Sequence, residues 1–240
     1  MIFVYDNSFE GFMTAIFESF KSKNETNEII SQKHFIQQSL FESVFIKTDD
    51  EKSRHAADIL IAKISKSFFC DIYYLYLADT PACGTVALQF IKDGLLHGKS
   101  VYNHNYTETV NAALVLKNKV LLENHRLKGL IRFRCADNIF LSDITPDHNV
   151  LPIIYKHFEN RMPHEKWIIR DTSRCIAAVH LDKGTVICDC DSYAPDISDK
   201  YEDIWCAFYK AIAIKERTNP RQQRSYMPKR YWKNIIETQL

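Results

Sequence analysis

The first 130 residues carry apolar side chains mostly at helical spacing. Residues 1–5 are an exception, because they are apolar and β-prone over a short run, and they predict a strand. Ser8 is expected to cap an amphipathic helix over residues 9–20, whose apolar side chains share one face. The polar, lysine-rich residues 21–33 predict a loop.

Four more helices are predicted before residue 130. Ser53 is expected to cap a helix with an apolar stripe that reaches Phe68. Residues 71–97 are rich in Tyr, Leu and Ile and predict two packed helices. Thr107 is expected to cap a long helix, and Gly129 lies where such a helix commonly stops.

The pattern then changes to alternation. Residues 130–136 and 139–144 have period two, and Asp137-Asn138 between them predicts a hairpin turn. Residues 150–161 and 201–212 have helical spacing. Between these two helices, three short strands are predicted at 167–171, 174–181 and 184–189, with Lys183-Gly184 in the last turn.

Together these elements predict an α+β protein. We expect a helical N-terminal half packed with an antiparallel sheet and flanking helices in the C-terminal half. The chain is expected to form a single compact domain over residues 1–240, with a soft sub-boundary near residue 125. Residues 1–125 are then mainly helical, and residues 126–240 hold the sheet, helices and a basic tail.

Composition is that of an ordinary globular protein, and we expect a cytoplasmic location. Of its 240 residues, 46% are hydrophobic and 25% charged, and no apolar run approaches the roughly 18 residues that a membrane helix needs. The chain opens MIFVYD without the basic start of a signal peptide, so we expect its seven cysteines to be reduced thiols. Cys188 and Cys190 share one face of a predicted strand, where packed thiols are expected in preference to a metal site.

The charge is uneven along the chain. The net charge is +1, yet residues 215–233 hold seven basic residues and one acid, which is +6 and leaves +1 − 6 = −5 for the rest. Basic side chains bind phosphates, and aromatic ones stack on exposed bases. The candidate nucleic-acid contacts in this tail are Arg217, Asn219, Arg221, Gln222, Arg224, Tyr226, Lys229 and Arg230.

The same segment makes a structural prediction. Pro220 and Pro228 interrupt any continuous helix, so the tail is expected to run as an ordered, extended cover. Tyr231 and Trp232 are expected to anchor it by burial, while the basic residues stay at the surface. Tyr226 is then the aromatic residue expected to stack on a base.

A second basic cluster without an acid occupies residues 125–134. Its candidate contacts are His125, Arg126, Lys128, Arg132 and Arg134. Arg132 and Arg134 are expected to be exposed on one face of a strand, on the side of the tail. The alternative is a solvated face whose arginines pair with acids elsewhere.

The loop ITPDHNVLP (residues 144–152) is the best candidate for chemistry. Asp147 and His148 have the residue types of a general acid–base pair. Asn149 is expected to begin the following helix and is also a candidate nucleic-acid contact. We expect the loop to open into a pocket near His125. A metal site with His157 is conceivable, but the spacing does not demand it.

No P-loop, dinucleotide glycine motif or metalloprotease motif is present, and no cofactor or metal is expected. The sequence does, however, resemble a bacterial family called probable DNA metabolism protein, which is carried as a domain of unknown function. The motifs with this resemblance are FVYDNSFEGFMTAIFE, HRLKGLIRFR, ITPDHNVLPIIYKHFENRMPHEKWIIRD and IKERTNPRQQRSYMPKRYWK. They span nearly the whole chain.

The resemblance implies a DNA-repair context. Genes of this family typically lie beside a radical SAM protein described as a putative DNA modification or repair enzyme, and a similar domain is fused to uracil-DNA glycosylase-like domains. No catalytic residue is settled for the family. The leading hypothesis is therefore a DNA-binding accessory protein that serves a repair enzyme. The alternatives are an enzyme acting on nucleic acid or nucleotide through Asp147 and His148, and a protein-interaction module whose tail docks onto the radical SAM partner.

Overall fold

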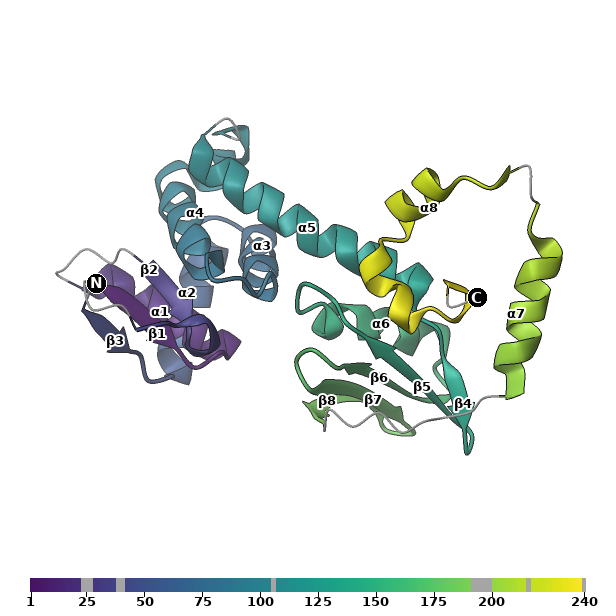
Figure 1. Cartoon of the computed structure of the whole chain (residues 1–240). Coiled ribbons are helices and arrows are strands. Elements are labelled where there is room, and N and C mark those ends of the chain that lie inside the picture. Colours follow the sequence, from purple (N-terminus) through teal and green to yellow (C-terminus); the bar gives the residue numbers. More distant parts are fainter. Residues whose placement is uncertain (23–27, 38–41, 105–106, 191–199, 215–216, 239–240) are drawn as a thin grey trace. The chain divides into compact units, whose positions relative to one another are not determined.

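The computed structural model describes residues 1–22, 28–37, 42–104, 107–190, 200–214 and 217–238. The chain divides into two compact units, Met1–Leu121 and Leu122–Leu240, called here the N-terminal and C-terminal units (Figure 1). The single-domain expectation stays a prediction. Within the described ranges, no helix is both long enough and apolar enough to cross a membrane.

The N-terminal unit combines helices with a small parallel sheet. The sheet has the order β2-β1-β3 and consists of β1 (Ile2–Tyr5), β2 (Glu28–Ser31) and β3 (Ser43–Phe45). The prediction of a loop at residues 21–33 is therefore wrong at β2. Only Ile29 and Ile30 are apolar and buried in β2, and two residues are too short a run to show a period. The α+β class is confirmed.

The helices of this unit begin close to where the sequence places them. They are α1 (Phe9–Lys21), α2 (Asp50–Lys63), α3 (Lys66–Leu77), α4 (Cys83–His97) and α5 (Glu108–Leu130), which continues into the C-terminal unit. The Ser8 hydroxyl caps α1 by accepting a bond of 2.9 Å from the Gly11 amide, as predicted. The predicted Ser53 cap is wrong, because Asp49 caps α2 through the Glu51 and Lys52 amides.

The C-terminal unit contains a five-stranded sheet. Its order follows the chain: β4 (Arg134–Ala136), β5 (Ile139–Ile144), β6 (Lys166–Asp171), β7 (Ile176–Leu181) and β8 (Gly184–Asp189). Three neighbouring pairs are antiparallel, but β5 and β6 are parallel, so the sheet is mixed and the purely antiparallel prediction is wrong. The cause is α6 (Leu151–Arg161), which forms the crossover that a parallel pair requires.

Two details of this unit decide where the basic residues lie. Asp137 and Asn138 both have positive φ, of 51° and 63°, which confirms the tight turn between β4 and β5. Helix α5, however, runs past Gly129 to Leu130, so the strand predicted over residues 130–136 is reduced to Arg134–Ala136. Arg132 consequently lies before the strand and not on it.

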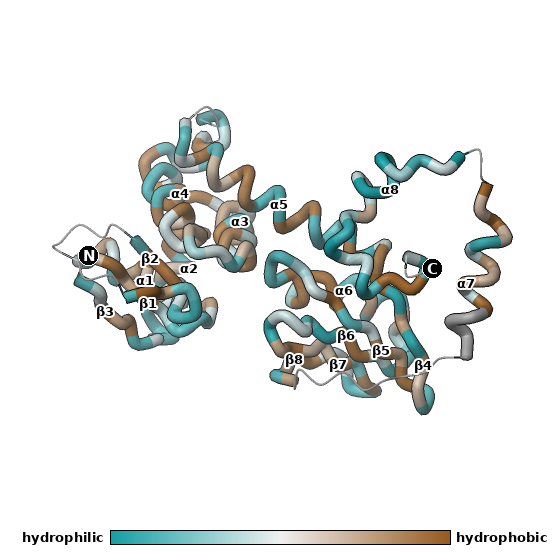
Figure 2. The backbone as a smooth tube through the Cα atoms, in the orientation of Figure 1, coloured by the Kyte–Doolittle hydropathy of each residue, from teal (hydrophilic) through white to brown (hydrophobic). Residues whose placement is uncertain are grey.

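One face of the sheet packs against α6. Trp167 of β6 is fully buried, and its ring stacks on His180 of β7 with centroids 4.9 Å apart. Phe158 of α6 meets the same indole edge-on at 6.4 Å. The strands are accordingly apolar along much of their length, whereas the later helix α8 (Pro220–Tyr226) is hydrophilic (Figure 2).

The chain ends with α7 (Lys200–Ile212), α8 (Pro220–Tyr226) and two 3₁₀ turns, Lys229–Asn234 and Ile236–Thr238. Helix α7 was expected from its apolar spacing, but α8 was not. The extended course predicted for the tail is therefore wrong. Pro220 lies in the first turn of α8, where its missing N–H costs no hydrogen bond, so this proline begins a helix and does not break one.

Candidate nucleic-acid interface

Tyr231 holds the tail against the rest of the C-terminal unit. Its side chain is fully buried, and its hydroxyl donates a hydrogen bond of 2.5 Å to Glu123 Oε1 on α5. Trp232 is only partly buried, and its indole N–H donates to the Met227 carbonyl at 2.8 Å. The prediction of an aromatic anchor is thus confirmed for Tyr231 and only in part for Trp232.

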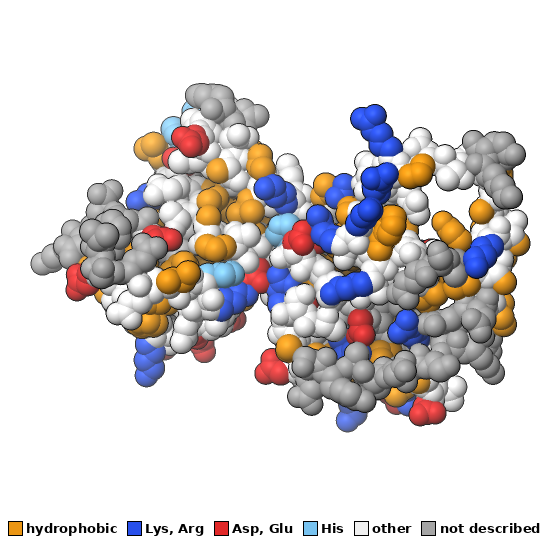
Figure 3. Space-filling model, in the orientation of Figure 1, with side chains coloured by type: hydrophobic (Ala, Val, Ile, Leu, Met, Phe, Trp, Pro, Cys, Tyr) orange, Lys and Arg blue, Asp and Glu red, His pale blue; other side chains and the backbone are white. Residues whose placement is uncertain are grey.

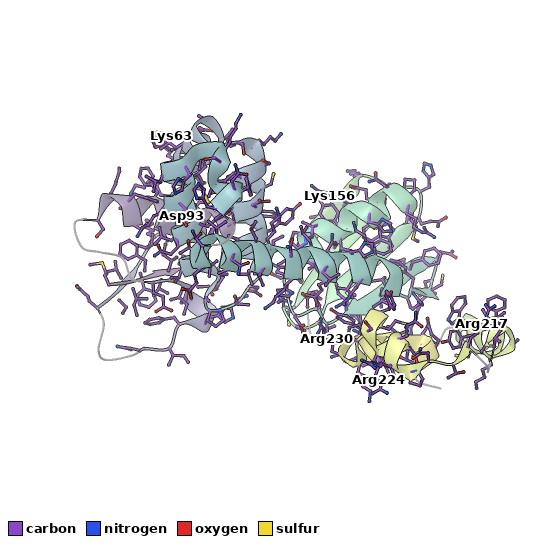
Figure 4. The ribbon with its side chains drawn as sticks, turned by 90° about the horizontal axis from the view of Figure 1, so that it is seen from above. Lys63, Asp93, Lys156, Arg217, Arg224 and Arg230 are labelled. Carbon is purple, nitrogen blue, oxygen red and sulfur yellow. The ribbon has the colours of Figure 1, made fainter. Side chains whose placement is uncertain are left out.

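The basic residues of the tail remain at the surface, as expected. Arg221, Arg224, Lys229 and Arg230 are all exposed, and together they are called the basic rim. Lysine and arginine side chains gather over α8 and the turn that follows it (Figure 3), and Arg224 and Arg230 both arise from this tail (Figure 4). Tyr226 lies between them in the sequence and is 70% exposed, so its ring is open for stacking.

One polar residue of the tail, Asn219, has a structural role that the sequence did not reveal. The Asn219 side chain caps α8 by accepting a hydrogen bond of 3.1 Å from the Gln222 amide. Gln222 is exposed on that helix, and Arg217 is exposed just before it. Asn219 therefore orients the helix that carries Arg221 and Arg224.

The second basic cluster meets the tail at one residue. Arg126 of α5 donates to the Ser225 carbonyl near the end of α8 at 3.3 Å, where a positive charge also complements the helix dipole. His125 is exposed on the neighbouring position, and Lys128 is partly buried. Arg126 thus links the two clusters that the sequence treats separately.

Arg132 does not lie where the alternation predicts. Its Nε and Nη2 atoms bind the Glu237 carboxylate at 3.1 and 2.5 Å, and Nη1 donates to the Gly129 carbonyl. Arg134 is on β4 and is also partly buried. The prediction that both arginines are exposed on one strand face is therefore wrong. Helix α5 extends to Leu130 and β4 begins only at Arg134, so Arg132 lies outside the strand.

Glu123 is the centre of the polar network beneath the tail, although the sequence interpretation passed over it. Its side chain is 2% exposed. The carboxylate accepts hydrogen bonds from the Asp147 and His148 amides at 2.9 and 2.8 Å, from His148 Nδ1 at 2.5 Å and from the Tyr231 hydroxyl. Burial alone would raise the pKa of Glu123, but these hydrogen bonds outweigh it and lower the pKa to about 2.

A signal for this role exists in the sequence. Glu123 follows Val120 by three residues and precedes Leu127 by four, so it shares a face of α5 with two apolar residues. A carboxylate on an apolar helical face is rarely buried without partners. A carboxylate at that position therefore needs hydrogen-bond partners, although the sequence does not identify them.

The acid–base pair predicted at the 144–152 loop is replaced by a different pair. Asp147 has a half-exposed side chain, and its Oδ2 lies 3.1 Å from Arg230 Nε. The carboxylate that the His148 imidazole binds is that of Glu123 and not that of Asp147.

Two further expectations for this loop differ from the structure. Asn149 does not begin the helix, since Val150 is the residue that caps α6. The Asn149 Oδ1 atom is buried, with no hydrogen-bond partner among the described residues. The loop packs against Glu123, and His125 is exposed, so the predicted pocket near His125 has no support.

Metal binding finds no support among the residues that the structure describes. No group of three or more His, Cys, Asp or Glu side chains there is arranged to hold an ion. Burial, together with the nearby charges of Lys128 and Arg161, lowers the pKa of His157. Such a positive environment disfavours a second cation.

The comparison with known families covers this whole region. The model of a domain of unknown function, DUF4130, matches residues 81–237, which is more than half of the chain. That range contains Glu123, His148, the basic rim and Glu237. No curated protein matches the chain. The chain therefore belongs to the DUF4130 family of domains of unknown function.

Proposed function

We propose that this protein binds DNA as an accessory factor in DNA repair or base modification in the cytoplasm, where it works with a radical SAM repair enzyme. The observation that carries the proposal is the basic rim on a tail that is held in place. Four exposed cations flank the exposed Tyr226, and the tail is fastened to α5 through the buried Tyr231. The resemblance to the probable DNA metabolism family supplies the repair context and the radical SAM partner.

The physical case rests on preorganisation. Free lysine and arginine side chains lose conformational entropy when they bind phosphate, and a disordered tail would lose backbone entropy as well. Here Asn219 caps the helix that carries Arg221 and Arg224, while the Tyr231 ring lies 4.8 Å from the Arg230 guanidinium. Phosphate contacts from such a fixed rim have a smaller ordering cost than contacts from a mobile tail.

The experiment that tests the proposal removes the rim. Replacing Arg221, Arg224, Lys229 and Arg230 with alanine is expected to weaken binding to labelled single- and double-stranded DNA. The slope of log affinity against log salt should flatten by about one unit for each lost phosphate contact. Affinity is measured by fluorescence anisotropy between about 50 and 200 mM salt.

The matched control removes four lysines from the N-terminal unit: Lys63, Lys66, Lys92 and Lys119, all of them exposed. This variant makes the same change in net charge and should leave the salt slope close to that of the unmodified protein. A variant that keeps Arg230, and so its contacts with Asp147 and Tyr231, separates lost phosphate contacts from a loosened tail. Unchanged affinity and slope in the rim variants would exclude the rim as a DNA-binding surface.

A second candidate function is catalysis on nucleic acid or nucleotide, supported by the pair of Glu123 and His148. A buried carboxylate that binds one imidazole nitrogen orients the ring, so the opposite nitrogen is the one that exchanges protons with a substrate. Asp147, which the sequence predicts as the acid of the pair, is then an exposed neighbour and not the partner of His148. Replacing His148 with alanine should abolish any turnover of DNA while the basic rim still binds it, and retained turnover would remove this candidate.

The third candidate, protein interaction, is supported by α7. Ile204, Phe208 and Ile212 recur at helical spacing and are 63, 51 and 56% exposed. This apolar stripe precedes the tail directly, and the radical SAM enzyme is the partner that the family resemblance names. Under this proposal α7 and the tail together dock that enzyme.

A further inference from the structure

An open pocket of about 680 Å³ lies in the N-terminal unit, outside the residues that the family model matches. It forms where the segment after β1 and the segment after β3 meet, at the carboxyl ends of these parallel strands. The strand order reverses there, because β2 lies on one side of β1 and β3 on the other. Ligands of open parallel sheets bind at such places, in pockets of roughly 300–1,000 Å³.

Asp6 fixes the two segments that border this pocket. Its Oδ1 atom accepts hydrogen bonds from the Ser8 amide and hydroxyl at 3.1 and 2.5 Å, and its Oδ2 atom accepts one from the Thr48 hydroxyl at 2.7 Å. Gly11 permits this approach, because a Cβ there would overlap Asp6 Oδ1 and lie 2.7 Å from Thr48 Oγ1. The border of the pocket is therefore held together before any ligand binds.

Ser53 of α2 brings a buried hydroxyl to the pocket. The residue is 7% exposed and is part of the lining. Asp49 and not Ser53 caps α2, and the Ser53 hydroxyl makes no hydrogen bond within the described part of the chain. Buried hydroxyls nearly always have a partner. A ligand in the pocket can supply the one that the chain does not.

The lining also has an apolar part. Phe9 and Met13 of α1, Ala57 of α2 and Phe69 of α3 contribute to it. The rings of Phe9 and Phe69 meet edge to face, with centroids 6.0 Å apart. Such a surface suits a flat aromatic ring, which gains both burial and ring–ring contact.

The charged side chains of the lining are predominantly acidic: Asp6, Glu10 and Asp50 stand against Arg54 alone. Burial by itself would raise the pKa of Asp6, but its hydrogen bonds outweigh that effect and lower the pKa, so the carboxylate is ionised. Glu10 and Asp50 are exposed, and neither is in an ion pair among the described residues. This lining disfavours a phosphate, whereas a carboxylate free of partners accepts hydrogen bonds from ribose hydroxyls.

We propose that this pocket binds an uncharged nucleoside, with the base against Phe9 and Phe69 and the ribose hydroxyls on Asp50. Asp50 and Ser53 are three residues apart and share a face of α2, so a ribose on Asp50 places the base beside the Ser53 hydroxyl. The inference does not rest on DNA binding, because all of these residues belong to the N-terminal unit.

The test titrates adenosine, guanosine, cytidine and uridine into the isotope-labelled full chain, and NMR follows the amide signals of Glu10 and Ser53. At least one nucleoside is expected to bind with a dissociation constant on the order of 0.1 mM, the typical affinity of a ligand of about 20 heavy atoms. Its 2′-deoxy form should bind about tenfold more weakly, because a hydrogen bond to a charged group is lost. Its 5′-monophosphate should also bind at least about tenfold more weakly, because the carboxylates repel it.

Two variants and a matched control locate the binding. Ser53→Ala removes no hydrogen bond of the fold and should weaken nucleoside binding several-fold, and Asp50→Asn should weaken it by about tenfold. Glu51→Gln is the control, since Glu51 is exposed in the same turn of α2 but is absent from the lining. It makes the same change in charge as Asp50→Asn and should leave the affinity unchanged. Unfolding in urea verifies that each variant is folded.

Four outcomes would overturn the proposal. The first is an absence of saturable shifts with all four nucleosides up to about 1 mM, ten times the expected dissociation constant. The second is a monophosphate that binds as tightly as its nucleoside, since the pocket then takes anions. The third is binding that neither Ser53→Ala nor Asp50→Asn weakens, and the fourth is an equal loss in Asp50→Asn and Glu51→Gln, which would be an effect of general charge.

Discussion

Glu123→Ala is expected to destabilise the C-terminal unit by about 3–5 kcal/mol. The carboxylate accepts four hydrogen bonds, and its removal leaves the Tyr231 hydroxyl, the His148 ring and two amides without their partner. Each buried donor left unsatisfied costs about 1–3 kcal/mol. The effect is measured as the free energy of unfolding in urea.

The same substitution should release the tail locally. Because Tyr231 is fastened to Glu123, amide hydrogen exchange is expected to accelerate in residues 229–234 before the rest of the unit opens. Glu108→Ala is the control, since Glu108 is exposed on the same helix and its removal costs at most about 1 kcal/mol through the helix dipole. Similar losses in the two variants would mean that Glu123 does not brace the tail.

The pH dependence of stability provides an independent readout of Glu123. Its pKa is about 2 in the folded protein, against an ordinary value of 4.5. A lowered pKa stabilises the fold above the ordinary value, and this stabilisation is lost as pH falls from about 4.5 towards 2. Glu123→Gln lacks this titration, so the stability difference between it and the unmodified protein should shrink by roughly 3 kcal/mol over that interval.

The sequence predicts the elements whose signal is local. Ser8 and the apolar spacing after it specify the start of α1, and the Asp137-Asn138 turn follows from residues that tolerate positive φ. The strands β6, β7 and β8 follow from alternation and turn chemistry. In each case the information lies within a few residues of the element.

The features that were missed depend on partners far away in the chain. β2 lies in a polar segment and is a strand only because it pairs with β1. Tyr231 binds Glu123 across 108 residues, and Arg132 binds Glu237 across 105. No local period encodes such pairings. This explains why the sequence identified the basic residues of the site but not Glu123 and Glu237, the acids that bind Tyr231 and Arg132.

Arg132→Ala is expected to be the second strongly destabilising change, and its cost should exceed that of Glu237→Ala. The two partners are not buried equally: the Glu237 side chain is 4% exposed and that of Arg132 is 26% exposed. Removing Arg132 leaves the buried Glu237 carboxylate without its partner, a change that costs about 3–5 kcal/mol. Removing Glu237 leaves an arginine that water reaches, so a loss of about 1–2 kcal/mol is expected. Unfolding in urea at neutral pH measures both.

The sign of the pH dependence distinguishes this explanation from simple loss of packing. Burial alone would raise the pKa of Glu237, but its hydrogen bonds with Arg132 outweigh that effect and lower it, so the pair stabilises the unmodified protein above the ordinary carboxyl value. Without Arg132, burial dominates and raises the pKa of Glu237. As pH falls, protonation of Glu237 then removes the unpaired buried charge. The stability gap between Arg132→Ala and the unmodified protein should therefore narrow from pH 7 to pH 4, and adding Glu237→Gln to Arg132→Ala should recover part of the loss at pH 7. The opposite outcome is a stability difference that stays constant with pH and that Glu237→Gln does not reduce. It would show that Arg132 acts through its packing and its bond to the Gly129 carbonyl, and not through Glu237.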